Sequence, residues 1–160
     1  MKRAIVVAAI ICLLAGPASK AVQAETDTQL FLSLGLMTDD SFKFNDFLLH
    51  LGLNLDLTLN DFLILSPELN LVTNKFKFKA FLLEPAILLN LKFSDSFFVG
   101  AGISKFLVIS EGDYFGSSDM ALKLNVGYFD EYFKFRIYLI TPFNDLFKNS
   151  LIGLQAGLSF

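Results

Sequence analysis

The sequence contains no tryptophan, one cysteine and one histidine among its 160 residues. The cysteine, Cys12, lies in a hydrophobic N-terminal segment, so the rest of the chain has no thiol for a disulfide or a cysteine metal site. After this segment no uninterrupted apolar run is long enough for a membrane-spanning helix. Disulfide scaffolds, cysteine-ligated metal proteins and helical membrane proteins are therefore excluded for that part of the chain.

The first 24 residues have the organisation of a signal peptide. Two basic residues precede an apolar run over residues 4–15, and the segment ends in Val-Gln-Ala before acidic residues begin. An apolar run of this length is too short to cross a bilayer as a helix. Because Cys12 lies inside the run and not after a lipoprotein box at its end, we expect no lipid anchor. We expect residues 1–24 to be removed on export.

The remaining segment is acidic and unusually apolar. Removing 24 residues from 160 leaves 136, enough for one domain with one core. Three of the 13 Lys and Arg residues lie in the removed segment, so 10 remain against 16 Asp and Glu, a net charge of −6. This balance argues against nucleic acid as a partner. Over half of all residues are apolar, and within lipid only helices and closed barrels satisfy the backbone polar groups.

Eight stretches alternate apolar residues with small or polar ones, which is the period of a β-strand. The predicted strands span residues 29–37, 47–59, 63–71, 81–91, 97–104, 120–128, 133–139 and 150–160. Short turns at 60–61, 94–96 and 130–131 alternate with longer loops at 38–41, 73–79, 111–118 and 142–149. This pattern predicts an all-β, eight-stranded antiparallel up-and-down transmembrane β-barrel over residues 25–160. With both ends of the chain in the periplasm, the short turns are periplasmic and the loops face outside.

A soluble eight-stranded barrel such as a lipocalin is the main competing architecture. Such a barrel places its apolar face inside and its charges outside, but eight strands leave interior room only for packed side chains. Here one face of the strands is bulky, continuous and rimmed by Phe and Tyr, whereas the other is rich in Gly, Ser, Asn and Ala. The bulky face suits lipid with its interfacial aromatic belts, so the membrane barrel is favoured.

Five short motifs in order along the chain resemble the outer-membrane β-barrel domain family. They are Ser66-Pro67-Glu68-Leu69, Leu83-Glu84-Pro85, Val99-Gly100-Ala101-Gly102, Arg136-Ile137-Tyr138 and Gly157-Leu158-Ser159-Phe160. This family comprises small barrels related in shape to OmpA and OmpX, and the resemblance covers the chain after the signal peptide. It implies an eight-stranded barrel inserted from the periplasm, without a common enzymatic activity. The external loops predicted here are shorter than in those relatives, which argues against adhesive or receptor roles.

Charged side chains alternate in phase with the inward-facing residues on five predicted strands. If the strands containing Glu68 and Glu84 pair symmetrically about a loop near Phe76, these two carboxylates lie side by side. Adjacent carboxylates repel, so they require a proton or neighbouring cations. Lys123 and Arg136 point inward at similar heights, and Tyr138 is placed to donate a hydrogen bond. We expect this lumen charge cluster to fill and stiffen the barrel, with a gate or proton path as the alternative.

The chain offers little sign of catalysis. Outer-membrane lipid A deacylases use a His and Ser pair that faces lipid. His50, the only histidine, is expected to face inward, and the second residue after it is Gly52 and not a serine, so the chain does not resemble such a site. The acids Glu111, Asp113 and Asp119 match no calcium-binding loop. We therefore expect no enzyme activity, no metal and no cofactor.

Five lysines alternate in phase with the outward-facing residues of their strands, and all five lie toward the external loops. They are Lys43, Lys77, Lys79, Lys105 and Lys148. Charges avoid the apolar band in any membrane barrel, but this does not explain why the lysines gather at only one end. Lipopolysaccharide phosphates lie at that level of the outer leaflet, where lysine stems can follow the lipid while the ammonium meets phosphate. The pattern predicts a lipopolysaccharide-binding lysine collar.

The predicted function is that of a non-catalytic barrel in the cell outer membrane, with a structural role in envelope integrity or a role in surface interactions. The alternative is a narrow transport pore or a lipid-modifying enzyme. Expected partners are outer-membrane lipids, lipopolysaccharide and the barrel-assembly machinery, which would read a closing terminal signature at Leu158 and Phe160. We expect a monomer that binds no nucleic acid.

Overall fold

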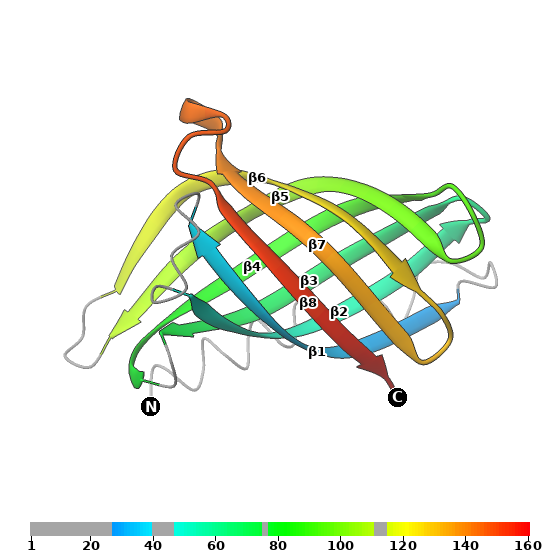
Figure 1. The fold of residues 1–160 in the computed structure, drawn as a ribbon, viewed down its shortest axis with the longest axis horizontal. Coiled ribbons are helices and arrows are strands. Elements are labelled where there is room, and N and C mark those ends of the chain that lie inside the picture. The colour runs from blue at the N-terminus through cyan, green and yellow to red at the C-terminus, as the bar shows by residue number, and fades with distance from the viewer. Residues whose placement is uncertain (1–26, 40–46, 75–76, 111–114) are drawn as a thin grey trace.

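The structure, a computed structural model, describes residues 27–39, 47–74, 77–110 and 115–160. Each of eight antiparallel strands pairs with the next, and the last pairs with the first, so the sheet closes into a barrel (Figure 1). The strands are β1 (Thr28–Asp39), β2 (Leu48–Asn60), β3 (Leu63–Asn74), β4 (Lys77–Lys92), β5 (Phe97–Ser110), β6 (Phe115–Phe129), β7 (Phe133–Pro142) and β8 (Leu151–Ser159). The predicted eight-stranded up-and-down barrel is confirmed. The predicted signal peptide lies outside the described residues.

Tight turns join β2 to β3, β4 to β5 and β6 to β7 at one end of the barrel, which we name the turn end. The turn end lies on the right in Figure 1. The opposite end, where the longer connections leave the strands, is named the loop end. In each turn a polar side chain accepts a backbone N–H two or three residues further on, as Asn, Asp and Ser do in turns. These bonds are Phe62 N–H to Asn60 Oδ1 (3.1 Å), Phe97 N–H to Ser94 Oγ (3.1 Å) and Phe133 N–H to Asp130 Oδ1 (2.8 Å). The three predicted turns are confirmed.

The strands extend further at the loop end than the sequence pattern predicts. β3 continues to Asn74 and β4 begins at Lys77, so most of the predicted loop over residues 73–79 is strand. β6 begins at Phe115, so the predicted start at Met120 is wrong by five residues, and Asp119 lies in a strand. Backbone pairing continues here although the apolar alternation has ended, because strands beyond a lipid band need no apolar outer face.

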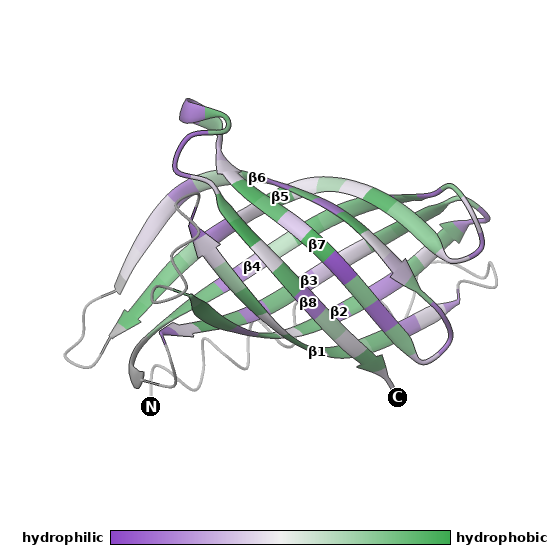
Figure 2. Cartoon of the chain, in the orientation of Figure 1, coloured by the Kyte–Doolittle hydropathy of each residue, from purple (hydrophilic) through white to green (hydrophobic). Residues whose placement is uncertain are grey.

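Hydrophobic and hydrophilic residues alternate along the strands (Figure 2). β8 illustrates the alternation, because Leu154 is 48% exposed whereas its neighbour Gln155 is only 2% exposed. Large apolar side chains are exposed on the outer faces of seven strands, among them Leu34, Ile87 and Ile137, and those of β3 are partly exposed. Within the described ranges, no helix is long and apolar enough to cross a membrane.

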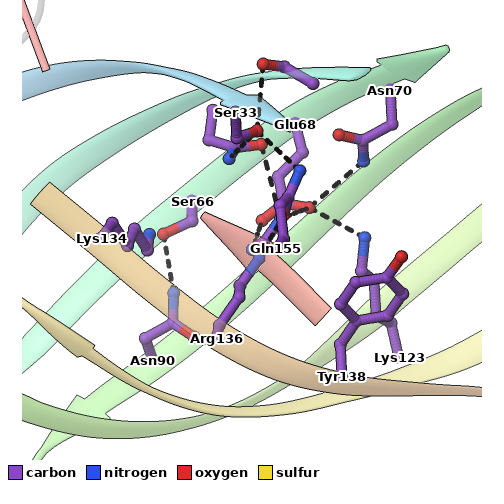
Figure 3. Close-up of polar contacts among 12 residues, drawn as sticks. Ser33, Ser66, Glu68, Asn70, Asn90, Lys123, Lys134, Arg136, Tyr138 and Gln155 are labelled. Carbon is purple, nitrogen blue, oxygen red and sulfur yellow. Dashed lines mark hydrogen bonds and ion pairs between the residues drawn. The ribbon is translucent and has the colours of Figure 1, made fainter. Parts of the chain in front are cut away.

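The lumen is filled by side chains arranged in layers. Toward the loop end lies an apolar cluster that includes Met37, Val72 and Ile140. Toward the turn end, the rings of Phe31 and Phe98 are fully buried. Buried polar and charged side chains lie between these two layers, because Lys134 lies near the rings of Phe31 and Phe98 and Tyr138 belongs to the apolar cluster. Figure 3 shows many of these polar side chains. The sequence pattern missed these inward apolar residues, although each shares its parity with a neighbouring inward polar residue.

Candidate functional site

The lumen charge cluster is centred on Glu68, which projects inward from β3. The guanidinium of Arg136 on β7 donates to both of its carboxylate oxygens, with a distance of 2.9 Å between Nη2 and Oε2. Lys123 Nζ on β6 donates to Glu68 Oε2 at 2.9 Å. A carboxylate held by two cations in this way is a charge-assisted, bidentate site of the strong kind.

Glu84 on β4 shares the same lysine. Lys123 Nζ donates to Glu84 Oε1 at 2.9 Å, and Asn70 Nδ2 donates to Glu84 Oε2 at 3.0 Å. Asn70 also reaches Glu68 Oε2 at 3.4 Å, so one amide and one ammonium bridge the two carboxylates. Shared donors therefore relieve the repulsion between the two carboxylates.

The predicted pairing of Glu68 directly opposite Glu84 is wrong by two residues. Glu84 pairs with Asn70, and Glu68 pairs with Ala86. The register shifts between Thr73 and Asn74, where extra residues on β4 oppose a shorter stretch of β3. A symmetric hairpin cannot reproduce such a bulge, so extrapolation from the loop placed the two strands out of register.

A second ion pair lies nearer the turn end and was not predicted as part of the cluster. Lys134 Nζ on β7 donates to Asp56 Oδ1 and Oδ2 on β2 at 2.8 and 2.6 Å. The ammonium also lies 5.4 and 5.2 Å from the ring centres of Phe31 and Phe98. Inward parity on both strands was the available signal, but it does not indicate which inward charges meet.

Neutral side chains connect the charges into a network. Gln155 Oε1 accepts from Arg136 Nε at 2.5 Å, and Gln155 Nε2 donates to Ser33 Oγ at 2.6 Å. Ser66 Oγ donates to Asp56 Oδ1 at 2.6 Å. Figure 3 shows these side chains converging from strands on opposite sides of the barrel. Six buried charged residues take part, and three negative charges balance three positive ones: Asp56, Glu68, Glu84, Lys123, Lys134 and Arg136.

Tyr138 and His50 form the loop-end edge of the network. Tyr138 Oη lies 2.5 Å from His50 Nδ1, and the two rings meet edge to face. His50 Nε2 makes no hydrogen bond to any residue that the structure describes and lies 3.6 Å from Glu84 Oε2. His50 is completely buried in the lumen, so it cannot contact a lipid on the outer surface.

The remaining predicted site residues lie at the ends of the barrel. Lys105 is half-buried in β5 and Lys148 is exposed after β7, whereas Lys43 and the side chains of Lys77 and Lys79 lie outside the described residues. In the part of the chain that the structure describes, no group of three acidic, His or Cys side chains is arranged to hold a metal ion. The loop acids Glu111 and Asp113 lie outside that part.

The predicted terminal signature lies at the seam that closes the barrel. Leu158 pairs with Leu32 of β1 on one side and with Phe133 of β7 on the other. Phe160 follows the end of β8 and is 80% exposed. Recognition of these residues by an assembly machinery stays a prediction.

Closed strand pairing, an apolar outer face and a filled, charge-balanced lumen together define an eight-stranded transmembrane β-barrel. No protein-family model and no curated protein sequence matches the chain. Solved structures do match it. The N-terminal β-barrel domain of Pseudomonas aeruginosa OprF aligns with a TM-score of 0.54 at 15% identity, covering 85% of this chain and 100% of that one.

Designed barrels align in the same way. The solution structure of the de novo designed TMB2.3 has a TM-score of 0.50 at 13% identity and covers 87% of this chain and 97% of its own. A de novo designed transmembrane β-barrel has a TM-score of 0.49 at 8% identity, with 82% and 95% covered. The alignment with the OprF domain confirms the resemblance to small eight-stranded outer-membrane barrels for the fold. At these identities the likeness extends to the fold alone.

Proposed function

We propose that this protein is an integral barrel of a bacterial outer membrane with a non-catalytic role in envelope integrity or surface interactions. The observation that carries the proposal is the reversal of polarity across the wall, with leucines exposed outside and six charges buried inside. Water stabilises the opposite arrangement, and lipid stabilises this one. The predicted signal peptide and the barrel architecture of the OprF domain support the same location.

The filled lumen supports a barrel that does not conduct ions. The charged middle layer lies between the apolar cluster containing Met37 and Ile140 and the rings of Phe31 and Phe98. An ion crossing this path would have to displace buried side chains that are already paired. We expect no single-channel steps in a planar bilayer when the refolded protein is compared with a known open porin under the same conditions. Reproducible steps would instead favour the narrow-pore alternative.

The lysine collar is the proposed lipopolysaccharide site. Lys148 is exposed at the loop end and Lys105 lies half-buried on the outer face of β5, which is the placement that a contact with lipid phosphates needs. Flexible ammonium groups bind phosphate chiefly through charge. The collar residues predicted from the sequence are Lys43, Lys77, Lys79, Lys105 and Lys148.

The collar is tested by replacing all five lysines with glutamine and measuring the lipopolysaccharide retained after purification from outer membranes. A matched variant replaces the same five with arginine, which keeps the charge, and a third replaces Lys92 near the turn end with glutamine. We expect retention to fall only in the five-fold glutamine variant. Equal retention in all variants would contradict the collar.

The remaining parts of the proposal concern partners and chemistry. We expect a monomer whose β8 strand is recognised by the barrel-assembly machinery.

The lipid-modifying alternative is tested by incubating the refolded barrel with radiolabelled lipid A and separating the products. Unchanged lipid A supports the non-catalytic role, whereas a new labelled product would overturn it.

A further inference from the structure

The segment between β7 and β8 forms an ordered loop with an apolar surface. It begins with a 3-10 turn, Phe143–Asp145, and continues to Asn149. Phe143, Leu146 and Phe147 are exposed in this short stretch, and Phe147 is the most exposed of them at 68%. Three large apolar side chains on one loop cost free energy in water, and an apolar environment that covers them would recover it.

The loop packs on the outside of the barrel wall. Thr141 pairs with Leu122, an outward-facing residue, and paired residues of adjacent strands face the same side. Thr141 is nevertheless 0% exposed, and its Oγ1 accepts a hydrogen bond of 2.8 Å from the backbone N–H of Phe147. Ser150, which has outward parity on the neighbouring strand, is also buried. The loop therefore covers its own base on the outer surface and does not lie over the lumen.

The loop backbone is held in an unusual conformation. Phe147 has a φ of 67° and Asn149 a φ of 51°, in the left-handed region that residues with a side chain rarely adopt. The bond from Phe147 to Thr141 and a second bond from Lys148 N–H to Asp145 O (3.0 Å) hold the loop in this shape. Its apolar side chains are thus presented by a defined structure.

The height of the loop along the barrel matches the edge of a lipid band. Thr141 lies eight residues beyond Phe133 at the turn end. A tilted strand rises about 2.5 Å per residue along the barrel axis, so Thr141 lies about 20 Å above Phe133, close to the top of an apolar band about 25 Å tall. β6 continues for six further residues, Phe115 to Met120, beyond Ala121, which pairs with Pro142. In Figure 1 the loop projects sideways and is set back from the ends of β5 and β6.

We propose that this loop is a lateral anchor that inserts Phe143, Leu146 and Phe147 into the headgroup and upper acyl-chain region of the outer leaflet. Their apolar surface continues the lipid-facing row of the barrel wall, while the exposed Lys148 beside them meets lipid phosphates. A lipid surface fits better than a protein partner because the loop projects from the outer wall and is set back from the ends of β5 and β6. The proposal rests on the proposed insertion of the barrel into a membrane.

The absence of tryptophan from the chain permits a direct test. Single-tryptophan variants Phe147→Trp, Leu154→Trp and Tyr132→Trp are refolded into phosphatidylcholine vesicles whose acyl chains carry bromine either near the headgroup or near the chain end. Leu154→Trp reports the middle of the outer face, and Tyr132→Trp reports the exposed turn end. We expect the tryptophan at 147 to emit at shorter wavelength than that at 132 and to be quenched more by shallow bromine than by deep bromine.

The three variants separate the possible failures. If the tryptophan at 147 is quenched by aqueous iodide as strongly as that at 132, and not by bromine, the anchor proposal is wrong. If the tryptophan at 154 is also not quenched by bromine near the chain end, the barrel does not span the bilayer, and the proposed function fails instead. If the tryptophan at 147 is not quenched by bromine and is protected from iodide only when a second protein is added, the loop binds a protein partner and the lipid assignment is overturned.

Discussion

The two faces of the barrel wall are built from the same strands but are stabilised in different ways. Outward residues such as Leu154 contribute to stability independently of one another, because each side chain contacts lipid and not a protein partner. Inward residues such as Glu68 are coupled, because one carboxylate contacts both Arg136 and Lys123. A change on the outer face should therefore depend on its depth, whereas a change on the inner face should depend on the partners it leaves behind.

The largest effect is expected on the inner face from Glu68→Gln. This change leaves Arg136 and Lys123 buried with less opposite charge, and breaking a buried ion pair on one side costs about 3–5 kcal/mol. Denaturant unfolding of the refolded barrel in vesicles, followed by circular dichroism, measures the loss. The exposed Asp119→Asn is the matched control and should change stability by less than about 0.5 kcal/mol.

Coupling on the inner face is tested by combining Glu68→Gln with Arg136→Gln. Because the second change removes the stranded cation, the double variant should lose less stability than the sum of the two single variants. Simple additivity would show that the buried contacts of Glu68 and Arg136 act independently and would contradict the comparison of the two faces.

The outer face should show a dependence on depth and not on partners. Leu154→Arg places a charge near the middle of the lipid band and should cost about 2–4 kcal/mol, whereas Leu158→Arg on the same strand near the turn end should cost about 0–1 kcal/mol. Both leucines are exposed in β8, so burial within the protein cannot explain a difference. The same unfolding assay in vesicles compares them, and equal losses would place the lipid band elsewhere.

A smaller effect is expected where the inner face is tightly packed. Gly153 lies against the ring of Tyr138, and a Cβ atom at this position would lie 2.2 Å from the ring carbon Cζ. Gly153→Ala should therefore cost about 1–3 kcal/mol through overpacking. Adding Tyr138→Val should recover part of that loss in the unfolding assay. No recovery would mean that the backbone, and not the ring, limits the site.

The smallest effect is expected from Tyr138→Phe, which removes only the hydroxyl next to His50 Nδ1. A single hydrogen bond contributes about 1 kcal/mol. His50 is the only histidine, so its ring nitrogen signals are identified in NMR spectra without ambiguity and should shift in this variant. Tyr128→Phe, at the turn end, should leave those signals unchanged, and a shift there would indicate a rearrangement of the barrel.

The sequence was sufficient to predict the strands, the turns and the direction in which most side chains face. Period-two alternation is a local property, so the leucines of 47–59 and the alternation of 150–160 could be assigned without knowing any partner. The prediction was less accurate at the loop end, where the alternation stops before the strands do. It also missed the apolar layers of the lumen, because inward apolar residues such as Phe31, Phe98 and Met37 share the phase of the small and polar residues around them.

The partners inside the lumen could not be predicted in the same way. Parity placed Glu68, Glu84, Lys123, Arg136 and Tyr138 inside, but the assumed symmetric hairpin paired the two glutamates directly, and the bulge in the β3–β4 pairing moved them apart. The contact between Asp56 and Lys134 joins residues 78 positions apart in the sequence. No periodic signal connects two such positions.

Local sequence by itself therefore determined how many strands the barrel has and which side chains lie inside or outside. Only the tertiary structure decided which inward charges meet and that the loop after β7 lies on the outer wall over Thr141. The physical reason is that the facing of a side chain depends on its own strand, whereas its partners depend on register, bulges and closure across all eight strands.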